Sequence, residues 1–230
     1  MSHFDRSRSD SSQVSIGNEG TKIVRVPDFF EDPDAVIAAA ETHQFAHINP
    51  HYPGIRAPVE ADLLAVLCDS VSDMAAIHLG QSKRSWQGQA WYSIVTRPAS
   101  SLTPIQRLPH FDGFDASQLA VMIYLNRTDH GGTAFYRQTS TGFECISEAR
   151  FADYKAQLEA GVRQTGLPPA AYISDGAPHF EKIHESDAAF NSLILYPGTI
   201  LHSGVIRNDR PLASDPRNGR LTINGFFRPA

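Results

Sequence analysis

Apolar and polar positions divide the chain into a helix-rich first part and a β-rich remainder. The Ala-rich stretch 34–45 follows the capping pair Asp32-Pro33, and the stretch 60–79 carries its apolar residues on one stripe, so both are predicted helices. After Ser85 the apolar residues occur in short runs separated by proline and glycine, which is typical of strands. The predicted strands are 21–26, 89–96, 119–125, 132–137, 193–196, 199–202 and 220–227.

These elements predict an α+β protein with a single domain over residues 21–230. Residues 21–84 form its helical part, and residues 85–230 form a β-barrel or β-sandwich core against which the helices pack. An insertion around 138–190 holds a further predicted helix and a Pro/Gly-rich loop over 165–178. Residues 1–20 are polar and Ser-rich, and they are predicted to be a disordered tail.

Composition narrows the classes of function. The net charge of -5 argues against a nucleic-acid-binding protein, which normally carries a basic surface. The two cysteines, Cys68 and Cys145, are too few for a disulfide framework. The polar N-terminus shows no secretory signal, and no apolar run is long enough to cross a bilayer. We therefore expect a cytoplasmic protein with no nucleic-acid or membrane partner; no heptad or exposed apolar stripe decides its oligomeric state.

The segment His110-Phe111-Asp112 is the strongest candidate for chemistry. Strand residues two apart point to the same side, so an imidazole and a carboxylate face one way while Phe111 faces the other. His202 follows a later turn and apolar run, and it is expected to supply a third ligand. Two imidazoles and one carboxylate are typical of a non-haem Fe(II) site. The hypothesis fails if the nearest imidazole nitrogens lie more than about 5 Å apart, because bonds of ~2.0–2.2 Å to one ion cannot span that separation.

Five motifs in order support this hypothesis. They are Tyr92–Val95, Leu108–Asp112, Tyr124–Asn126 with Gly131–Tyr136, Leu193–His202, and Gly219–Thr222. In this order they resemble the Fe(II)/2-oxoglutarate-dependent dioxygenases, in particular the prolyl-4-hydroxylase-like branch. The resemblance extends from Tyr92 to Phe227.

The resemblance implies a fold, cofactors and roles. The core would be a double-stranded β-helix (jelly roll, cupin-like), and His110, Asp112 and His202 would hold iron. Arg220 would bind the distal carboxylate of 2-oxoglutarate through its guanidinium fork, with Tyr92 and Thr222 beside it. Together with O2, this site would hydroxylate a C–H bond of a small-molecule or peptide substrate and release succinate and CO2.

Two departures from the family pattern leave alternatives. The insertion around 138–190 is long, and it is expected to form a lid or an extra wall over the site. The interval between His202 and Arg220 is also long, so Arg207 and Arg210 rival Arg220; we prefer Arg220 because Thr222 and Asn224 would share its strand face.

Other polar residues are assigned structural roles. His43 and His47 are expected at a solvated helix end, and His179 and Glu181 in a polar loop. Arg56 could reach an acidic substrate, but an ordinary ion pair is the preferred role. Two alternative functions remain: a non-catalytic β-helix sensor or binding module, and a cupin-like metalloenzyme that does not use 2-oxoglutarate.

Overall fold

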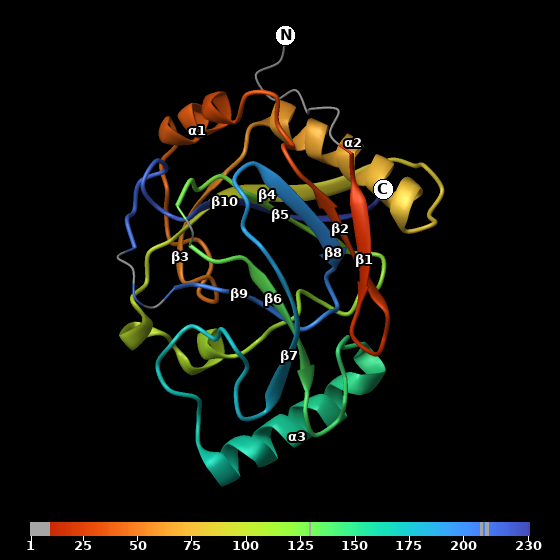
Figure 1. Cartoon of the computed structure of the whole chain (residues 1–230), viewed down its shortest axis with the longest axis vertical. Helices are drawn as coiled ribbons and strands as arrows, with labels where there is room; N and C mark the ends of the chain where they lie inside the picture. Colours follow the sequence, from red (N-terminus) through yellow and green to blue (C-terminus); the bar gives the residue numbers. More distant parts are fainter. Residues whose placement is uncertain (1–9, 129, 208, 210–211) are drawn as a thin grey trace.

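The computed structural model describes residues 10–128, 130–207, 209 and 212–230, and it has a mixed α/β fold built on antiparallel sheets (Figure 1). The strands are β1 Ser12–Ile16, β2 Thr21–Val26, β3 Gly54–Pro58, β4 Trp86–Val95, β5 Leu119–Tyr124, β6 Thr133–Gln138, β7 Phe180–Ser186, β8 Ser192–Pro197, β9 His202–Gly204 and β10 Leu221–Pro229. The α-helices are α1 Pro33–Glu41, α2 Ala61–His78 and α3 Glu148–Thr165, and two short 3₁₀ helices cover Ala99–Ser101 and Pro104–Arg107.

The strands form two sheets, and successive parts of the chain belong to one sheet or the other. The larger sheet has the order β1-β2-β8-β5-β10-β4-β3, and the smaller has the order β7-β6-β9. From β4 onward the chain passes back and forth: β4, β5, β8 and β10 belong to the larger sheet, and β6, β7 and β9 to the smaller. An isolated bridge between His110 and His202 adds a further segment to the edge of the smaller sheet. The segments around both histidines are therefore neighbours in space.

Strand β5 shows how the layers are made. All six of its residues are buried, since both faces of the strand are covered. Leu119, Val121 and Ile123 join the core between the larger sheet and the N-terminal helices. Ala120, Met122 and Tyr124 face the interior and pack with side chains of β8 and with Phe135 of β6. A strand buried on both faces reads as a continuous apolar run rather than an alternating one.

The helices cover the outer faces of the two sheets. Side chains of α1 and α2, such as Val36 and Leu67, pack with residues of β4 and β10. Figure 1 shows α3 at the opposite end of the molecule, beyond β6 and β7. Its Tyr154 packs with Tyr136 and Phe180 of those two strands. None of the described helices is long and apolar enough to cross a membrane.

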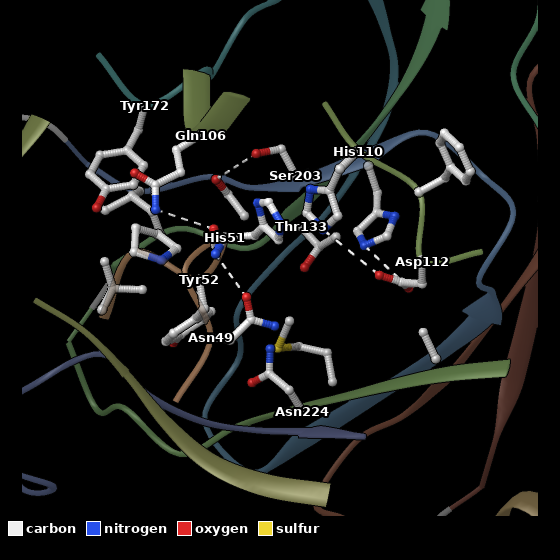
Figure 2. A pocket seen from close by; sticks show the side chains of 18 of the residues that line it. Asn49, His51, Tyr52, Gln106, His110, Asp112, Thr133, Tyr172, Ser203 and Asn224 are labelled. Atoms are coloured by element: carbon white, nitrogen blue, oxygen red, sulfur yellow. Dashed lines mark hydrogen bonds and ion pairs between the residues drawn. The ribbon is translucent and has the colours of Figure 1, made fainter. Parts of the chain in front are cut away.

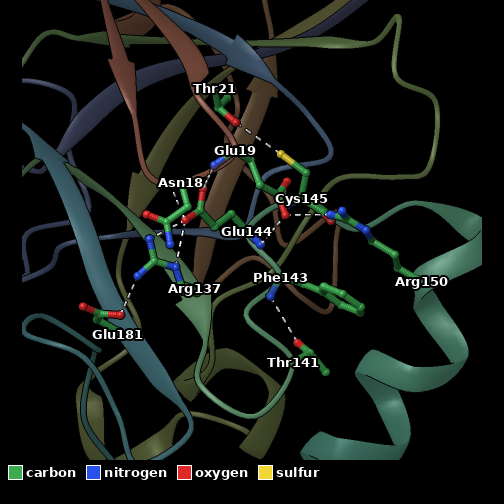
Figure 3. Close-up of polar contacts among 10 residues, drawn as sticks. All are labelled: Asn18, Glu19, Thr21, Arg137, Thr141, Phe143, Glu144, Cys145, Arg150 and Glu181. Carbon is green, nitrogen blue, oxygen red and sulfur yellow. Dashed lines mark hydrogen bonds and ion pairs between the residues drawn. The ribbon is translucent and has the colours of Figure 1, made fainter.

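The N-terminal segment departs from the prediction of a disordered tail over 1–20. Residues 1–9 lie outside the described residues, but Ser12–Ile16 form β1 and pair with β2. The turn between these strands is held by the buried carboxylate of Glu144, which accepts hydrogen bonds from the backbone N–H groups of Asn18 and Glu19 at 2.8 and 3.0 Å (Figure 3). The polar composition misled the prediction, because the contact that orders this segment comes from a residue more than a hundred positions away.

Two edge strands were also missed. Strand β3 contains Gly54 and ends at Pro58, residues that weaken a strand prediction but are tolerated at a sheet edge. Strand β7 carries only two large apolar residues, Phe180 and Ile183, and it lies at the edge of the smaller sheet. Of the two residues expected in a polar loop, His179 lies in the turn just before β7 and Glu181 lies in the strand.

Candidate metal centre

The two histidines are brought together by backbone pairing. The N–H of His110 donates to the carbonyl of His202 at 2.9 Å, and the N–H of His202 donates to the carbonyl of His110 at 2.8 Å. This pairing places the ring centroids 4.3 Å apart. Asp112 is fixed two residues further along, where its N–H donates to the carbonyl of Gly198 at 2.7 Å.

The donor atoms of His110, Asp112 and His202 all lie within 4.8 Å of one another. The His110 Nε2 to Asp112 Oδ1 distance is 3.9 Å, and the His202 Nε2 to Asp112 Oδ2 distance is 3.7 Å. Two bonds of about 2.1 Å to a shared ion place their donors at most ~4.2 Å apart, so the widest separation needs only a small side-chain adjustment. The predicted convergence of these three side chains is present, and in the described part of the chain no other such group of three occurs.

His202 is fixed in one tautomer by its surroundings. Its Nδ1 lies 2.9 Å from the carbonyl oxygen of Ile200. A carbonyl can only accept, so Nδ1 carries the proton and the lone pair of Nε2 points toward Asp112. Orientation of a ligand imidazole by a carbonyl is common around protein metals. The sequence alone gave no way to name Ile200 as this partner.

The protonation states of the three side chains favour binding of a cation. Burial lowers the pKa of His202 to about 4, and partial desolvation and the neighbouring imidazole lower the pKa of His110, whose side chain is 54% exposed. Both rings are therefore neutral near pH 7, as metal ligands must be. Burial raises the pKa of Asp112 to about 6. Its buried Oδ2 has no hydrogen-bond partner among the described residues, and a bound metal ion would satisfy this oxygen.

The centre opens into a cavity of about 440 Å³ between the sheets. Figure 2 shows His110 and Asp112 toward one end of this cavity and Tyr172 and Gln106 toward the other. Its apolar walls include Val95, Ile105, Leu108, Met122, Ile206 and Phe226. Tyr172 comes from the 138–190 insertion and donates its hydroxyl proton to the carbonyl of Arg97 at 2.6 Å. The insertion thus supplies part of the wall, as expected.

Arg220 lines the same cavity and is only 3% exposed. Its Nη2 donates to the carbonyls of Gly131 and Gly132 at 3.1 and 3.0 Å, which fixes the guanidinium. Its buried Nε has no hydrogen-bond partner within the residues that the structure describes. The rival Arg207 lies near Asp209 at 3.6 Å, and Arg210 lies outside the described residues.

Tyr92 does not reach the cavity, and the expectation that it contacts a co-substrate is wrong. It packs in the core between the larger sheet and the helices, where its hydroxyl donates to Glu60 at 2.9 Å. The reason is strand parity: Tyr92 pairs with Ile223, whereas its neighbour Ser93 pairs with Thr222. Thr222 is fully buried on the interior side, and its hydroxyl donates to Asn224 Oδ1 at 2.7 Å.

One cavity residue, Arg56, differs from its preferred prediction. Arg56, expected in an ordinary ion pair, has no ionic partner among the described residues and stacks over the ring of Tyr52 at 3.9 Å.

Among the other histidines, Nδ1 of His43 lies 2.9 Å from the carbonyl of Ala39, and Nδ1 of His47 lies 2.8 Å from that of Gly54. Neither belongs to a candidate metal group among the described residues.

Comparison with known proteins gives a family but little further detail. The model of a family of unknown function, DUF6445, matches residues 7–227. No curated protein matches the chain. Among solved structures, HygX from Streptomyces hygroscopicus with nickel, 2-oxoglutarate and hygromycin B bound is 12% identical, covers 92% of this chain and 84% of its own, and has a TM-score of 0.47.

A second solved structure gives similar values. The non-heme alpha ketoglutarate dependent epimerase SnoN from nogalamycin biosynthesis is 10% identical over 90% of this chain and 78% of its own, with a TM-score of 0.47. At these values the two structures support no conclusion about the chemistry of this chain. Its function has to be argued from its own residues.

Proposed function

We propose that this protein is a non-haem Fe(II)- and 2-oxoglutarate-dependent oxygenase. The chain belongs to DUF6445, a family of unknown function, so the proposal rests on the residues of its own site. The observation that carries the proposal is the convergence of His110, Asp112 and His202 at one end of a cavity that also contains Arg220. Two imidazoles and one carboxylate leave coordination positions open, as this chemistry requires. The expected cytoplasmic location and a small-molecule or peptide substrate are part of this proposal.

The sheet topology supports the fold that the proposal needs. Strands β4, β10, β5 and β8 are adjacent in the larger sheet, and the smaller sheet runs from the His110 segment through β9 and β6 to β7. We interpret this alternation as a double-stranded β-helix, with β1, β2 and β3 as additions at the edges of the larger sheet. The assignment to the prolyl-4-hydroxylase-like branch stays a prediction from the five motifs.

Each residue of the site has a proposed task. His110, Asp112 and His202 would hold Fe(II), and the Ile200 carbonyl keeps the His202 Nε2 lone pair aimed at it. Arg220, fixed through Nη2, has its remaining N–H groups available for the distal carboxylate of the co-substrate. Bound iron and 2-oxoglutarate would supply the oxidising power, with O2, for a C–H hydroxylation that releases succinate and CO2. The apolar walls would limit the access of water to the reacting groups.

The first test is binding by calorimetry without oxygen, using Ni(II) as a redox-inert ion and then 2-oxoglutarate. We expect His202→Ala to weaken Ni(II) binding by about 100-fold or more, since loss of even an orienting partner of a ligand costs 10–100-fold. Arg220→Gln should keep Ni(II) but weaken 2-oxoglutarate by about tenfold or more.

Tyr92→Phe is the matched control, because Tyr92 lies on the other face of the sheet. It should leave both affinities unchanged. Wild-type protein that binds neither ligand would refute the proposal. Full 2-oxoglutarate affinity in Arg220→Gln would show that another residue binds the distal carboxylate, whereas Ni(II) binding without 2-oxoglutarate binding in the wild type would favour a metalloenzyme that does not use this co-substrate.

A further inference from the structure

Arg56 is a second guanidinium inside the same cavity. Strand register places it there: Arg56 pairs with Ser93, Ser93 with Thr222, and Thr222 with Tyr124. These four residues form one row across β3, β4, β10 and β5 on the interior face of the larger sheet. The two central side chains, Ser93 and Thr222, are small, and the Arg56 guanidinium lines the cavity beside them.

Aromatic side chains fix the position of the Arg56 guanidinium, but among the described residues no anionic group pairs with it. The side chain is 8% exposed, and its guanidinium carbon lies 3.9 Å from the centroid of the Tyr52 ring and 5.6 Å from that of Trp91. Its buried Nε has no hydrogen-bond partner in the described part of the chain. Arg137, which is only partly buried, differs in having anionic partners: it donates to Glu144 and Glu181, each at 2.8 Å.

A buried guanidinium without an anion is costly, and a ligand that supplies one repays part of that cost. Burial lowers the pKa of Arg56, and the electrostatic interactions with Tyr52 and Asp112 act in the opposite direction. Asp112 therefore acts on Arg56 through space, but the two make no ion pair among the described contacts. The missing anion has to come from a molecule that enters the cavity.

We propose that Arg56 binds a carboxylate of the primary substrate, which is then an organic acid with an apolar body. The inference rests on the proposed function, in which Arg220 serves the co-substrate. A single planar guanidinium matches a carboxylate in charge and shape. The only other guanidinium among the described cavity residues, Arg220, already donates to two carbonyls. The apolar side chains around the cavity fit the rest of such a molecule.

The experiment compares acids with their uncharged amides in the presence of Ni(II) and N-oxalylglycine, an unreactive analogue of 2-oxoglutarate. The probes are 3-phenylpropanoate and 4-methylpentanoate, each beside its amide, titrated by calorimetry. We expect wild-type protein to bind the better acid about tenfold or more tightly than its amide, the effect of one charge-assisted pair. Arg56→Gln should abolish this preference while changing N-oxalylglycine affinity less than about threefold, and Arg56→Lys should keep part of it.

Arg127→Gln is the matched control, because Arg127 also stacks on an aromatic ring, that of Phe190 at 4.1 Å, but lies outside the cavity. It should preserve the preference for acids. Unfolding curves of every variant show whether the fold is kept, and Arg56→Lys retains the charge if Arg56→Gln does not fold.

Several results would overturn the inference. Equal affinity for acid and amide, or no binding of either acid to wild-type protein, would remove the carboxylate subsite. Loss of N-oxalylglycine in Arg56→Gln with retention in Arg220→Gln would make Arg56 the residue of the co-substrate instead. Wild-type protein that binds neither Ni(II) nor N-oxalylglycine would refute the proposed function, and the acid and amide titrations, repeated without them, would still decide the role of Arg56.

Discussion

The carboxyl group of Asp112 is buried beside two neutral imidazoles, so its negative charge is unfavourable in the metal-free protein. Its pKa of about 6 lies above the ordinary value of 3.8. A carboxyl whose pKa is raised by folding stabilises the folded state most at low pH, and this contribution is lost as pH rises through about 6. At neutral pH the ionised group therefore costs the metal-free protein stability.

Asp112→Asn should consequently stabilise the metal-free protein at pH 7.5, by about 2 kcal/mol, while abolishing Ni(II) binding. The measurement is denaturant unfolding in the presence of a chelator at pH 7.5 and pH 4.5. The advantage of the variant should shrink at the lower pH, because Asp112 is then protonated in the folded wild type. An equal or lower stability of the variant at pH 7.5 would contradict the argument.

Residue-level prediction succeeded where the motif and strand parity agreed. His110 forms an isolated bridge, Asp112 lies in a bend two residues further on, and both reach the cavity. The prediction for Tyr92 was wrong because Tyr92 pairs with Ile223 and not with Thr222, so its side chain faces away from the cavity. This register is visible only in the paired strands. Arg56 was given an ion pair because a lone arginine in a sequence carries no record of which carboxylates lie near it.

At the scale of elements, Glu144 joins the β1–β2 turn to the segment after β6. Its carboxylate accepts from Asn18, Glu19 and Arg137 and is fully buried. Gly17, at φ +64°, lies so close that a Cβ there would be 2.1 Å from Glu144 Oε2. Burial alone would raise the pKa of Glu144, but these hydrogen bonds lower it below 4.5. We therefore expect this link to contribute to the order of the N-terminal hairpin.

Glu144→Gln should cost about 3 kcal/mol of stability at pH 7, because it leaves Arg137 without its buried partner. A carboxyl with a lowered pKa stabilises the fold above its unfolded pKa, so the difference from wild type should shrink as pH falls below about 4.5. Denaturant unfolding across this range measures it, and amide hydrogen exchange over 12–26 should accelerate. Unchanged exchange in this hairpin would show that other contacts hold it.

Elements whose order comes from distant partners were the hardest to predict. Strands with both faces buried, such as β5 and β8, carry their own signal in continuous apolar runs. The edge strands β1, β3 and β7 do not, because pairing on one side orders them while the other side stays exposed or irregular. The predicted single domain over 21–230 stays a prediction.

At the scale of the whole molecule, the cavity is built from both sheets and the insertion. Arg56 lies on β3 of the larger sheet, Arg220 directly precedes β10, His202 lies on β9 of the smaller sheet, and Tyr172 comes from the insertion. A ligand that contacts all of them stabilises the folded state by mass action, with no effect on the unfolded chain.

Ni(II) with 2-oxoglutarate, each at 100 times its dissociation constant, should therefore add at least about 2.7 kcal/mol and raise the melting temperature by roughly 5–10 °C. Thermal unfolding followed by circular dichroism measures the shift. His202→Ala should show almost none of it. A shift of equal size in that variant would mean that the ions bind elsewhere.

The reciprocal hydrogen bonds between His110 and His202 have one more consequence. Both rings, and the carboxylate two positions on, depend on the same alignment of two short segments. Slippage of one segment by a single position would turn its ligands away from the site, either His110 together with Asp112 or His202. Metal binding therefore requires the intact register of these two segments. The affinity for an ion can be adjusted only by substituting one of the three side chains, not by a shift of register.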